Sequence, residues 1–282
     1  MVPGSRQART RTIAVALSMV ALIAGREAAA AEPSGSQVVQ QMRAVLEPDK
    51  PSVRLMDLTV TGGDENTTFK LVQARKQLPD GRRSLTVLLA PPAARGLAYL
   101  VEEKKGGAPV EYVYVPMVRR VRKFMGTENH SAFLDSDFTY ADLGFLPTDT
   151  KDTLVGEEKV AGREVYKVES VPDAEVKRWY YSKIATWIDK ETLLPVQRDF
   201  YDPAGQVFKI ETFGSVTRVD GIPTAMQITM DTVGAQSKSK LDVTDVTYGT
   251  GLPDDLFSPA KLSQIAELVE KTGATKPKAK AK

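Results

Sequence analysis

Residues Tyr112–Leu143, with the sequence YVYVPMVRRVRKFMGTENHSAFLDSDFTYADL, concentrate more charge and aromatic surface than any other stretch of the chain. The stretch begins with alternating tyrosine and valine, the period of two that is typical of a β-strand. Four cations follow, and then a polar loop that contains Gly126 and the only histidine, His130. An acidic and aromatic segment completes the stretch. This order predicts a basic strand and an acidic segment whose charges can pair across a hairpin-sized connection.

Alternation of apolar and polar residues extends outward in both directions, from Val53 to Tyr248. Turn signals interrupt it at short intervals, and glycine in these turns supplies the positive φ that tight hairpins need. Helical windows between the strands are missing, which disfavours parallel α/β folds. We therefore predict a mainly β protein whose ten or eleven strands form one antiparallel meander, strongly curved or barrel-like. The turn signals are Leu78–Gly81, Gly106–Gly107, Ala161–Gly162, Asp202–Gly205 and Asp220–Gly221.

Two short helices are predicted at the ends of this β region. Residues Ser34–Glu47 begin with a capping serine and carry an apolar stripe, so they form an amphipathic helix that either packs on the sheet or covers a cavity. Residues Pro259–Glu270 form a second amphipathic helix. The apolar stripe of the first helix consists of Val38, Met42, Val45 and Leu46.

The first 31 residues have the pattern of a secretory signal peptide. Three arginines precede the mostly apolar segment Thr12–Ala24, and three alanines end at Ala31. The apolar segment is shorter than the ~20 residues that span a bilayer, so we expect cleavage before Glu32 and export of the mature protein. The mature domain then covers residues 32–270. Residues 271–282 form a lysine-rich tail that we expect to be disordered.

Composition excludes several classes of function. Residues 1–31 hold four of the 38 Lys and Arg residues and one of the 36 Asp and Glu residues, so the remainder has 34 cations and 35 anions. A nucleic-acid-binding protein usually keeps a strong basic excess. The chain has no cysteine, which excludes disulfides, thiolate metal sites and a lipid-modified cysteine anchor.

No motif indicates catalysis, and we predict neither an enzyme nor a cofactor. Asp135, Asp137 and Asp142 lack the regular spacing of a calcium loop. His130 and Ser131 are adjacent in sequence and lack a nucleophile elbow, which argues against a hydrolase. A glycine-rich phosphate loop after a strand is also missing.

The chain resembles the periplasmic outer-membrane lipoprotein-sorting proteins, the LolA- and LolB-like carriers. The similarity runs from about Phe69 to Pro259, and its most specific part is the segment SDFTYADL. The stretches that carry it are Pro92–Gly96, Tyr112–Pro116 with Arg119–Arg122, Asp135–Leu143, Trp187–Thr192 with Leu194–Pro195, and Gly251–Phe257.

The resemblance implies an incomplete, half-open β-barrel of about eleven strands, covered by helices and loops, that shelters acyl chains in transit across the periplasm. Members of this branch often accompany inner-membrane exporters of the RND type, so it also implies an RND-type transporter and an outer-membrane acceptor as partners. The greater length and the acidic, aromatic loop depart from the best-known carriers. The cargo is therefore left open between lipoprotein, free lipid and polycyclic lipid, and the alternative function is a non-catalytic adaptor of an RND-type exporter.

A curved sheet of about eleven strands encloses more width than side chains fill, although a packed sandwich core would show the same alternation. If a cavity exists, apolar residues of the central strands and of the loop are expected to line it. Which face of each strand points inward is not determined by the pattern, because a shift of one residue inverts the face. The candidate residues are Leu85, Val87, Tyr99, Val101, Tyr112, Tyr114, Phe133, Phe138 and Tyr140.

The charges of the opening stretch have two interpretations. The cations can form a solvated strand edge that deters aggregation. Alternatively, Arg119, Arg120 or Arg122 pairs with Asp135, Asp137 or Asp142, and the pair holds the aromatic residues as a lid over the barrel mouth.

Overall fold

The computed structural model describes Met1 and residues 32–62, 65–173, 179–235 and 237–271. The predicted signal peptide, apart from Met1, and the predicted tail, apart from Lys271, lie outside the described residues. The compact unit begins at Pro33. None of the helices in the described ranges is both long enough and apolar enough to cross a membrane.

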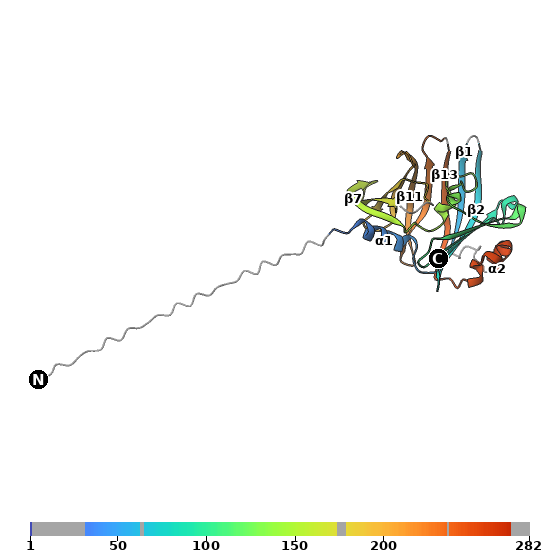
Figure 1. Ribbon diagram of the computed structural model, residues 1–282, viewed down its shortest axis with the longest axis horizontal. Coiled ribbons are helices and arrows are strands. Elements are labelled where there is room, and N and C mark those ends of the chain that lie inside the picture. The colour runs from blue at the N-terminus through green and yellow to red at the C-terminus, as the bar shows by residue number, and fades with distance from the viewer. Residues whose placement is uncertain (2–31, 63–64, 174–178, 236, 272–282) are drawn as a thin grey trace, which may run out of the picture. The chain divides into compact units, whose positions relative to one another are not determined.

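Strands dominate the fold, as the alternation predicts, and the described residues form thirteen of them in one antiparallel sheet (Figure 1). The prediction of about eleven was too low. Two of the strands have a weak sequence signal, since β6 has only four residues and β7 carries a mixture of both charges instead of a clean alternation. The strands are β1 (Ser52–Gly62), β2 (Glu65–Leu78), β3 (Gly81–Ala90), β4 (Ala98–Lys104), β5 (Val110–Val115), β6 (Arg120–Lys123), β7 (Thr150–Val160), β8 (Arg163–Pro172), β9 (Lys183–Asp189), β10 (Pro195–Tyr201), β11 (Val207–Val219), β12 (Ile222–Thr232) and β13 (Ser237–Tyr248).

The order of the strands explains why the sheet stays open. It runs β6-β5-β4-β3-β2-β1-β13-β12-β11-β10-β9-β8-β7, so two meanders join where β1 pairs with β13 (Figure 1). The two edge strands, β6 and β7, are consecutive in the chain but do not pair with each other. The residues that connect them, 124–149, must therefore pass from one edge of the sheet to the other. We call residues 124–149 the crossing segment.

The sheet is strongly curved. Tyr99 of β4 and Ile184 of β9 belong to one buried cluster, although their strands are eight positions apart in the sheet. In a flat sheet that separation would be roughly 38 Å, because neighbouring strands lie about 4.8 Å apart. Curvature brings them together and creates a concave face. The result is an open, curved barrel, as the sequence predicts.

Helix α1 (Gly35–Leu46) covers one end of the concave face. Ser34 caps it, because its hydroxyl accepts a hydrogen bond from Gln37 N while the Gln37 side chain accepts one from Ser34 N, in a capping box. Val38 and Met42 are buried against β8 and β9. A Cβ atom on Gly35 would lie 2.5 Å from Leu154 N of β7, so only glycine permits this close approach.

The C-terminal segment covers the convex face of β1–β5. It consists of short 3-10 turns followed by α2 (Ile265–Lys271), where the sequence predicts a single helix over Pro259–Glu270. Its apolar residues Phe257, Leu262 and Ile265 are buried in the cluster that contains Leu85 and Val87. The 3-10 turns are η1 (Pro92–Ala94), η2 (Pro116–Val118), η3 (Glu128–His130), η4 (Ala141–Leu143), η5 (Asp254–Phe257) and η6 (Pro259–Gln264).

Candidate functional site

The crossing segment fills much of the concave face with its own aromatic residues. Phe133 and Phe138 are buried in the same cluster as Leu58 of β1 and Met230 of β12. A bridge between Ala132 and Thr139 closes the tip of the segment into a tight loop. Inside the tip the Ser136 hydroxyl donates to the Phe133 carbonyl at 2.6 Å. This folded tip presents its aromatic side chains to the sheet.

A chain of edge-to-face aromatic contacts extends from this tip toward the edge of the sheet. The Tyr140 ring packs against Phe133, Phe124 and Tyr99, with ring centroids 5.1, 5.0 and 5.3 Å away. Such contacts stabilise by roughly 0.5–1.5 kcal/mol each beyond the area they bury. The Tyr99 hydroxyl donates to Glu111 at 2.6 Å. Burial and the Glu111 carboxylate raise the pKa of Tyr99 well above its usual value.

Asp137 anchors the tip to the sheet. Its carboxylate accepts hydrogen bonds from Ser239 at 2.7 Å and from Ser237 at 2.8 Å, both on β13. Its backbone carbonyl accepts one from Lys209 of β11. Lys209 is itself buried, and this burial lowers its pKa. The anchor therefore joins the crossing segment to two central strands.

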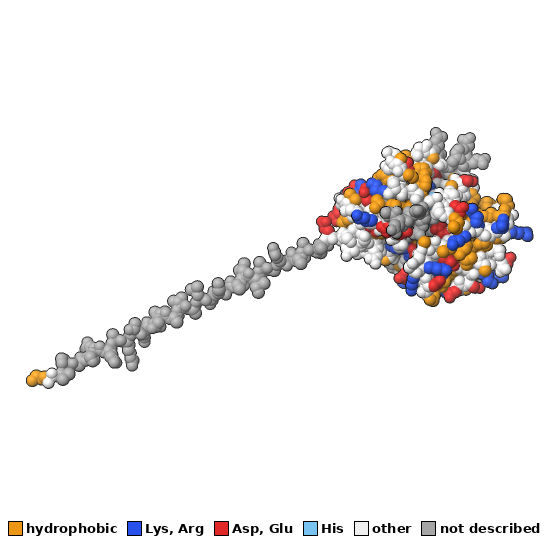
Figure 2. Space-filling view, in the orientation of Figure 1, with side chains coloured by type: hydrophobic (Ala, Val, Ile, Leu, Met, Phe, Trp, Pro, Cys, Tyr) orange, Lys and Arg blue, Asp and Glu red, His pale blue; other side chains and the backbone are white. Residues whose placement is uncertain are grey.

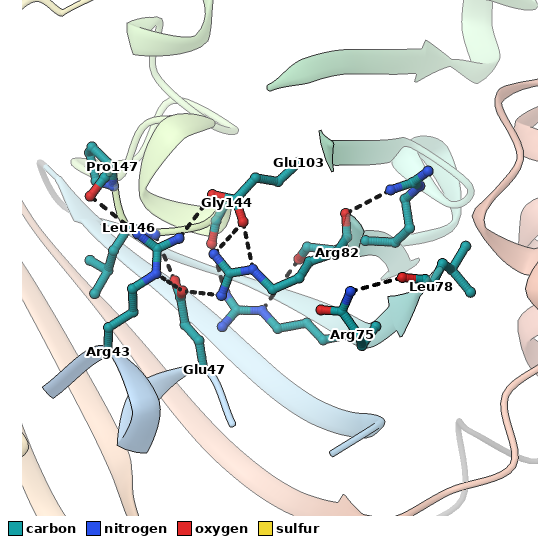
Figure 3. A network of polar contacts seen from close by, with 12 residues as sticks. Arg43, Glu47, Arg75, Leu78, Arg82, Glu103, Gly144, Leu146 and Pro147 are labelled. Atoms are coloured by element: carbon teal, nitrogen blue, oxygen red, sulfur yellow. Dashed lines mark hydrogen bonds and ion pairs between the residues drawn. The ribbon is translucent and has the colours of Figure 1, made fainter. Parts of the chain in front are cut away.

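A second anchor holds residues 143–147 to β2 and α1. Gln73 donates to the carbonyl of Leu143 at 3.0 Å, and Arg75 donates to the carbonyl of Gly144 at 2.7 Å. Leu146 N donates to Glu47, the residue at the C-terminal cap of α1, at 2.6 Å. Figure 3 shows the contacts of Gly144 and Leu146 within one network of charged side chains.

Most charged side chains in this network form ion pairs with one another. The Glu47 carboxylate, which is buried, accepts from Arg82 at 2.8 Å and pairs with Arg43 at 3.2 Å. Glu103 pairs with Arg43 at 2.9 Å and with Arg82 (Figure 3). Arg75 lies within the network and has no carboxylate partner among the described residues. Burial lowers the pKa of Arg75 to about 10.

Between the crossing segment, α1 and the sheet lies a cavity of about 170 Å³. Typical small-molecule sites have volumes of ~300–1,000 Å³, so the cavity in this conformation is too small for an acyl chain. The lining is mixed. Its apolar and largely aromatic residues are Trp179, Tyr181, Ile184, Phe200, Phe213 and Ile228. Its charged residues include Arg54, Arg75, Glu111, Asp142, Arg198 and Glu211.

Arg198 and Glu211 form a buried pair in this cavity, with Arg198 Nε 2.6 Å from Glu211 Oε2. Burial raises the pKa of Glu211 to about 7, although Arg198 acts in the opposite direction. Arg198 Cζ also lies 5.4 Å from the ring centroids of both Phe200 and Phe213. The lining therefore combines aromatic and charged side chains in one small space.

The nine candidate cavity residues do not line one space. Tyr99 and Val101 line the cavity. Phe133, Phe138 and Tyr140 lie in or against the concave cluster, where they fill the barrel. The prediction that all nine line one cavity was wrong for the other four, because they belong to or pack against the convex cluster under α2. These are Leu85, Val87, Tyr112 and Tyr114.

The predicted pairing between arginines and aspartates was also wrong. Across the described ranges, none of Arg119, Arg120 and Arg122 forms an ion pair with Asp135, Asp137 or Asp142. Arg122 pairs with Glu128 at 3.1 Å instead. Asp142 accepts from Thr139 inside its own turn, and Asp135 is exposed. The lid interpretation assigned the wrong charges. The aromatic residues that it placed over the barrel mouth lie in or against the concave cluster instead.

The sequence did not indicate the anchors at Asp137 and Glu47 or the charged residues that line the cavity. A usable signal existed in β11, where Lys209, Glu211 and Phe213 share one face. Charged residues in phase with buried apolar ones indicate a polar site inside a sheet. The partners of Asp137 carry no such signal, since Ser237 and Ser239 lie about a hundred residues away.

The side chains that could suggest catalysis are used structurally. The Ser131 hydroxyl donates to the Glu128 carbonyl at 2.7 Å, within its own turn. His130 packs edge-to-face on Tyr181. Within the described part of the chain, no group of three or more His, Asp or Glu residues is placed to hold a metal ion.

Comparisons with known proteins agree with the geometry. A structure from Vibrio parahaemolyticus, described as a putative outer membrane lipoprotein-sorting protein domain, matches with a TM-score of 0.74 and 24% identity, and covers 81% of this chain and 98% of that one. A protein of the DUF1329 family from Desulfovibrio piger matches with a TM-score of 0.75 and 27% identity, over 81% and 97% of the two chains. A LolA superfamily protein from Nitrosomonas europaea matches with a TM-score of 0.65 and 16% identity, over 80% and 98%.

No curated protein matches the chain. A family model whose description reads "Uncharacterized protein" matches residues 80–264, which include the crossing segment and most of the sheet. The chain belongs to this family. Its open curved barrel has the same fold as the lipoprotein-sorting domain and the LolA superfamily protein.

Proposed function

We propose that the protein is a periplasmic carrier that shelters the acyl chains of a lipoprotein or lipid on the concave face of its half-open barrel. The observation that carries the proposal is that this apolar face is covered by a segment of the protein itself, the crossing segment. The likeness to a lipoprotein-sorting domain supports the same role.

Exchange between the crossing segment and cargo explains how such a carrier can bind and release. Phe133 and Phe138 bury apolar surface on the concave face, and an acyl chain in their place would bury a similar surface at about 25 cal/mol per Å². The burial of the acyl chain would then offset the apolar burial that Phe133 and Phe138 lose, so transfer needs no catalytic step. The small cavity of about 170 Å³ is the entry point from which the segment is displaced.

The proposed location of the protein is the periplasm. Cleavage of residues 1–31 would release the mature protein into the periplasm, and N-terminal sequencing of the exported protein should begin at or near Glu32. An N-terminal sequence that begins at Met1 would contradict the cleavage. An inner-membrane RND-type transporter and an outer-membrane acceptor stay predicted partners.

Binding of a fluorescent fatty acid tests the carrier function directly. Dansyl-labelled undecanoic acid should bind the chain from Glu32 onward with increased fluorescence. Ile228 lies on the cavity wall, so Ile228→Trp should fill the entry point and weaken binding about tenfold or more, equivalent to ~1.4 kcal/mol. The matched control is Val171→Trp on β8, where the side chain is exposed. Equal affinity in both variants, or no binding at all, would favour the adaptor alternative.

Lipid extraction from protein purified from the envelope provides an independent test. A carrier should co-purify with acyl-containing molecules that mass analysis detects. An adaptor that docks on an exporter should not.

A further inference from the structure

The turn η2, the edge strand β6 and the residues directly after β6 expose apolar side chains that do not pack in a hydrophobic core. The exposed fractions are 89% for Met117, 58% for Val118, 42% for Val121 and 66% for Met125. These are four of the nine large apolar residues that are exposed in the described part of the chain, and they fall within one short stretch. Clustered exposure of this kind marks an interaction surface.

The fold itself forces this stretch outward. β6 pairs only with β5, so its other edge is free. Arg119 adopts a left-handed conformation with φ of 50° between η2 and β6, which reverses the chain and projects η2 from the sheet. All four residues of β6 are exposed. Figure 2 shows apolar and basic side chains gathered at this end of the sheet, where Figure 1 draws the teal and green strands.

Cations surround the apolar residues. Arg119, Arg120, Arg122 and Lys123 are exposed, and among the described residues only Arg122 forms an ion pair, with Glu128. We call these four cations together with Met117, Val118, Val121 and Met125 the basic edge patch.

Helix α2 lies close to the patch, and more cations follow α2 in the sequence. A Cβ atom on Gly96 would lie 3.6 Å from both Pro116 of η2 and Ala266 of α2, so α2 begins beside the patch. From Ala266 to the end of α2 at Lys271 is about 7.5 Å of helix. The next eleven residues contain four more lysines.

We propose that the basic edge patch binds the surface of a bilayer that contains anionic phospholipids. Its cations complement the lipid phosphates, while its methionine and valine side chains enter the boundary between headgroups and acyl chains. A partner protein that adds a strand to β6 is disfavoured, because a four-residue edge with charges on both faces discourages strand addition. The proposal concerns a surface outside the cavity and does not depend on the carrier function.

The basic edge patch lies next to the crossing segment. β6 leads directly into the crossing segment, and Asn129 and His130 of that segment line the cavity. Docking through the patch would therefore place the entry point of the cavity beside the membrane.

Vesicle co-sedimentation tests the proposal with the chain from Glu32 to Lys282, because the apolar segment before Glu32 would itself bind lipid. Vesicles of phosphatidylcholine mixed with phosphatidylglycerol should retain the protein, and pure phosphatidylcholine should not. Binding should weaken as salt rises. Replacing three cations, as Arg119→Gln, Arg120→Gln and Lys123→Gln, should weaken it about a hundredfold, at roughly fivefold per charge. Met117→Ser with Val118→Ser should weaken it about tenfold.

A matched control lies at the opposite edge of the sheet. Val155 and Lys151 of β7 are also exposed, so Val155→Ser with Lys151→Gln should leave binding unchanged. The two sets of variants should unfold at the wild-type temperature, since all the positions are exposed. No retention on anionic vesicles, or equal losses at both edges, would overturn the proposal. Loss of binding after deletion of residues 272–282 alone, with no effect of the patch variants, would also overturn it.

Discussion

Asp137 is the single residue that most firmly holds the crossing segment to the sheet. It is buried and its carboxylate accepts two serine hydroxyls. A partly exposed ion pair would contribute only about 0–1 kcal/mol, but removing a partner from a buried polar group costs about 1–3 kcal/mol. The structure thus changes the expected effect of mutation at this position.

Ser239→Ala should lower the free energy of unfolding by about 1–3 kcal/mol, because one oxygen of the buried Asp137 carboxylate loses its donor. Asp137→Asn should act in the same direction and should speed the entry of a fatty-acid probe. Denaturant unfolding and stopped-flow fluorescence measure the two effects. The matched control is Asp135→Asn, since Asp135 is exposed in the same loop and should change stability by less than about 0.5 kcal/mol. Equal effects at positions 135 and 137 would contradict the anchor.

Glu211 makes stability depend on pH. Its pKa in the folded protein is raised from 4.5 to about 7, so the folded state binds more protons than the unfolded state between these values. Its contribution to stability is therefore present below pH 4.5 and is lost as pH rises to about 7.

Glu211→Gln should remove this dependence, because the amide oxygen still accepts from Arg198 but does not titrate. Between pH 5 and pH 8 the free energy of unfolding of the wild type should fall relative to that of the variant, by up to ~3 kcal/mol. Urea unfolding at the two pH values measures the difference. Parallel pH profiles for the two proteins would show that Glu211 does not titrate in this range.

Among the elements, α1 depends on a close approach to β7 that the sequence marks only by a glycine. Gly35→Ala should push the first turn of α1 away from Leu154, since the added Cβ would lie 2.5 Å from its backbone nitrogen. Overpacking of this kind costs about 1–3 kcal/mol, measurable by thermal unfolding. Gly156→Ala on β7 is the control, because nothing lies within 4 Å of its Cβ position. A wild-type melting temperature for Gly35→Ala would contradict the packing of α1.

Some elements could be predicted from sequence because their signals are local. Ser34 caps α1 as its position indicates, and the Asp202–Gly205 turn joins β10 to β11. The inward face of β4 could not be predicted, because Ala98–Glu102 are all buried. A strand covered on both sides shows no alternation that distinguishes concave from convex. Tyr99 and Val101 were thus grouped with Leu85 and Val87, although the two pairs lie on opposite faces.

The position of the crossing segment could be predicted in part. Its aromatic residues indicate burial against the sheet, but the residues that hold it are distant in sequence. Glu47 ends α1, and Arg75 and Ser239 lie in strands whose sequences carry no special signal. No local pattern contains that information.

In the molecule as a whole, two separate segments cover the two faces of one curved sheet. The C-terminal segment covers the convex face of β1–β5 with a large apolar cluster. The crossing segment covers the concave face beside a cavity and is held by separate polar anchors. Cargo binding should therefore displace the second covering and leave the first unchanged.

Amide hydrogen exchange with and without saturating dansyl-labelled undecanoic acid tests this most directly. The amides of Asp137 and Leu146 donate to Ser239 and Glu47, respectively, and should lose protection when the probe binds. Amides of α2 and β3 should keep theirs. Bound probe together with unchanged or greater protection at positions 137 and 146 would contradict displacement of the crossing segment.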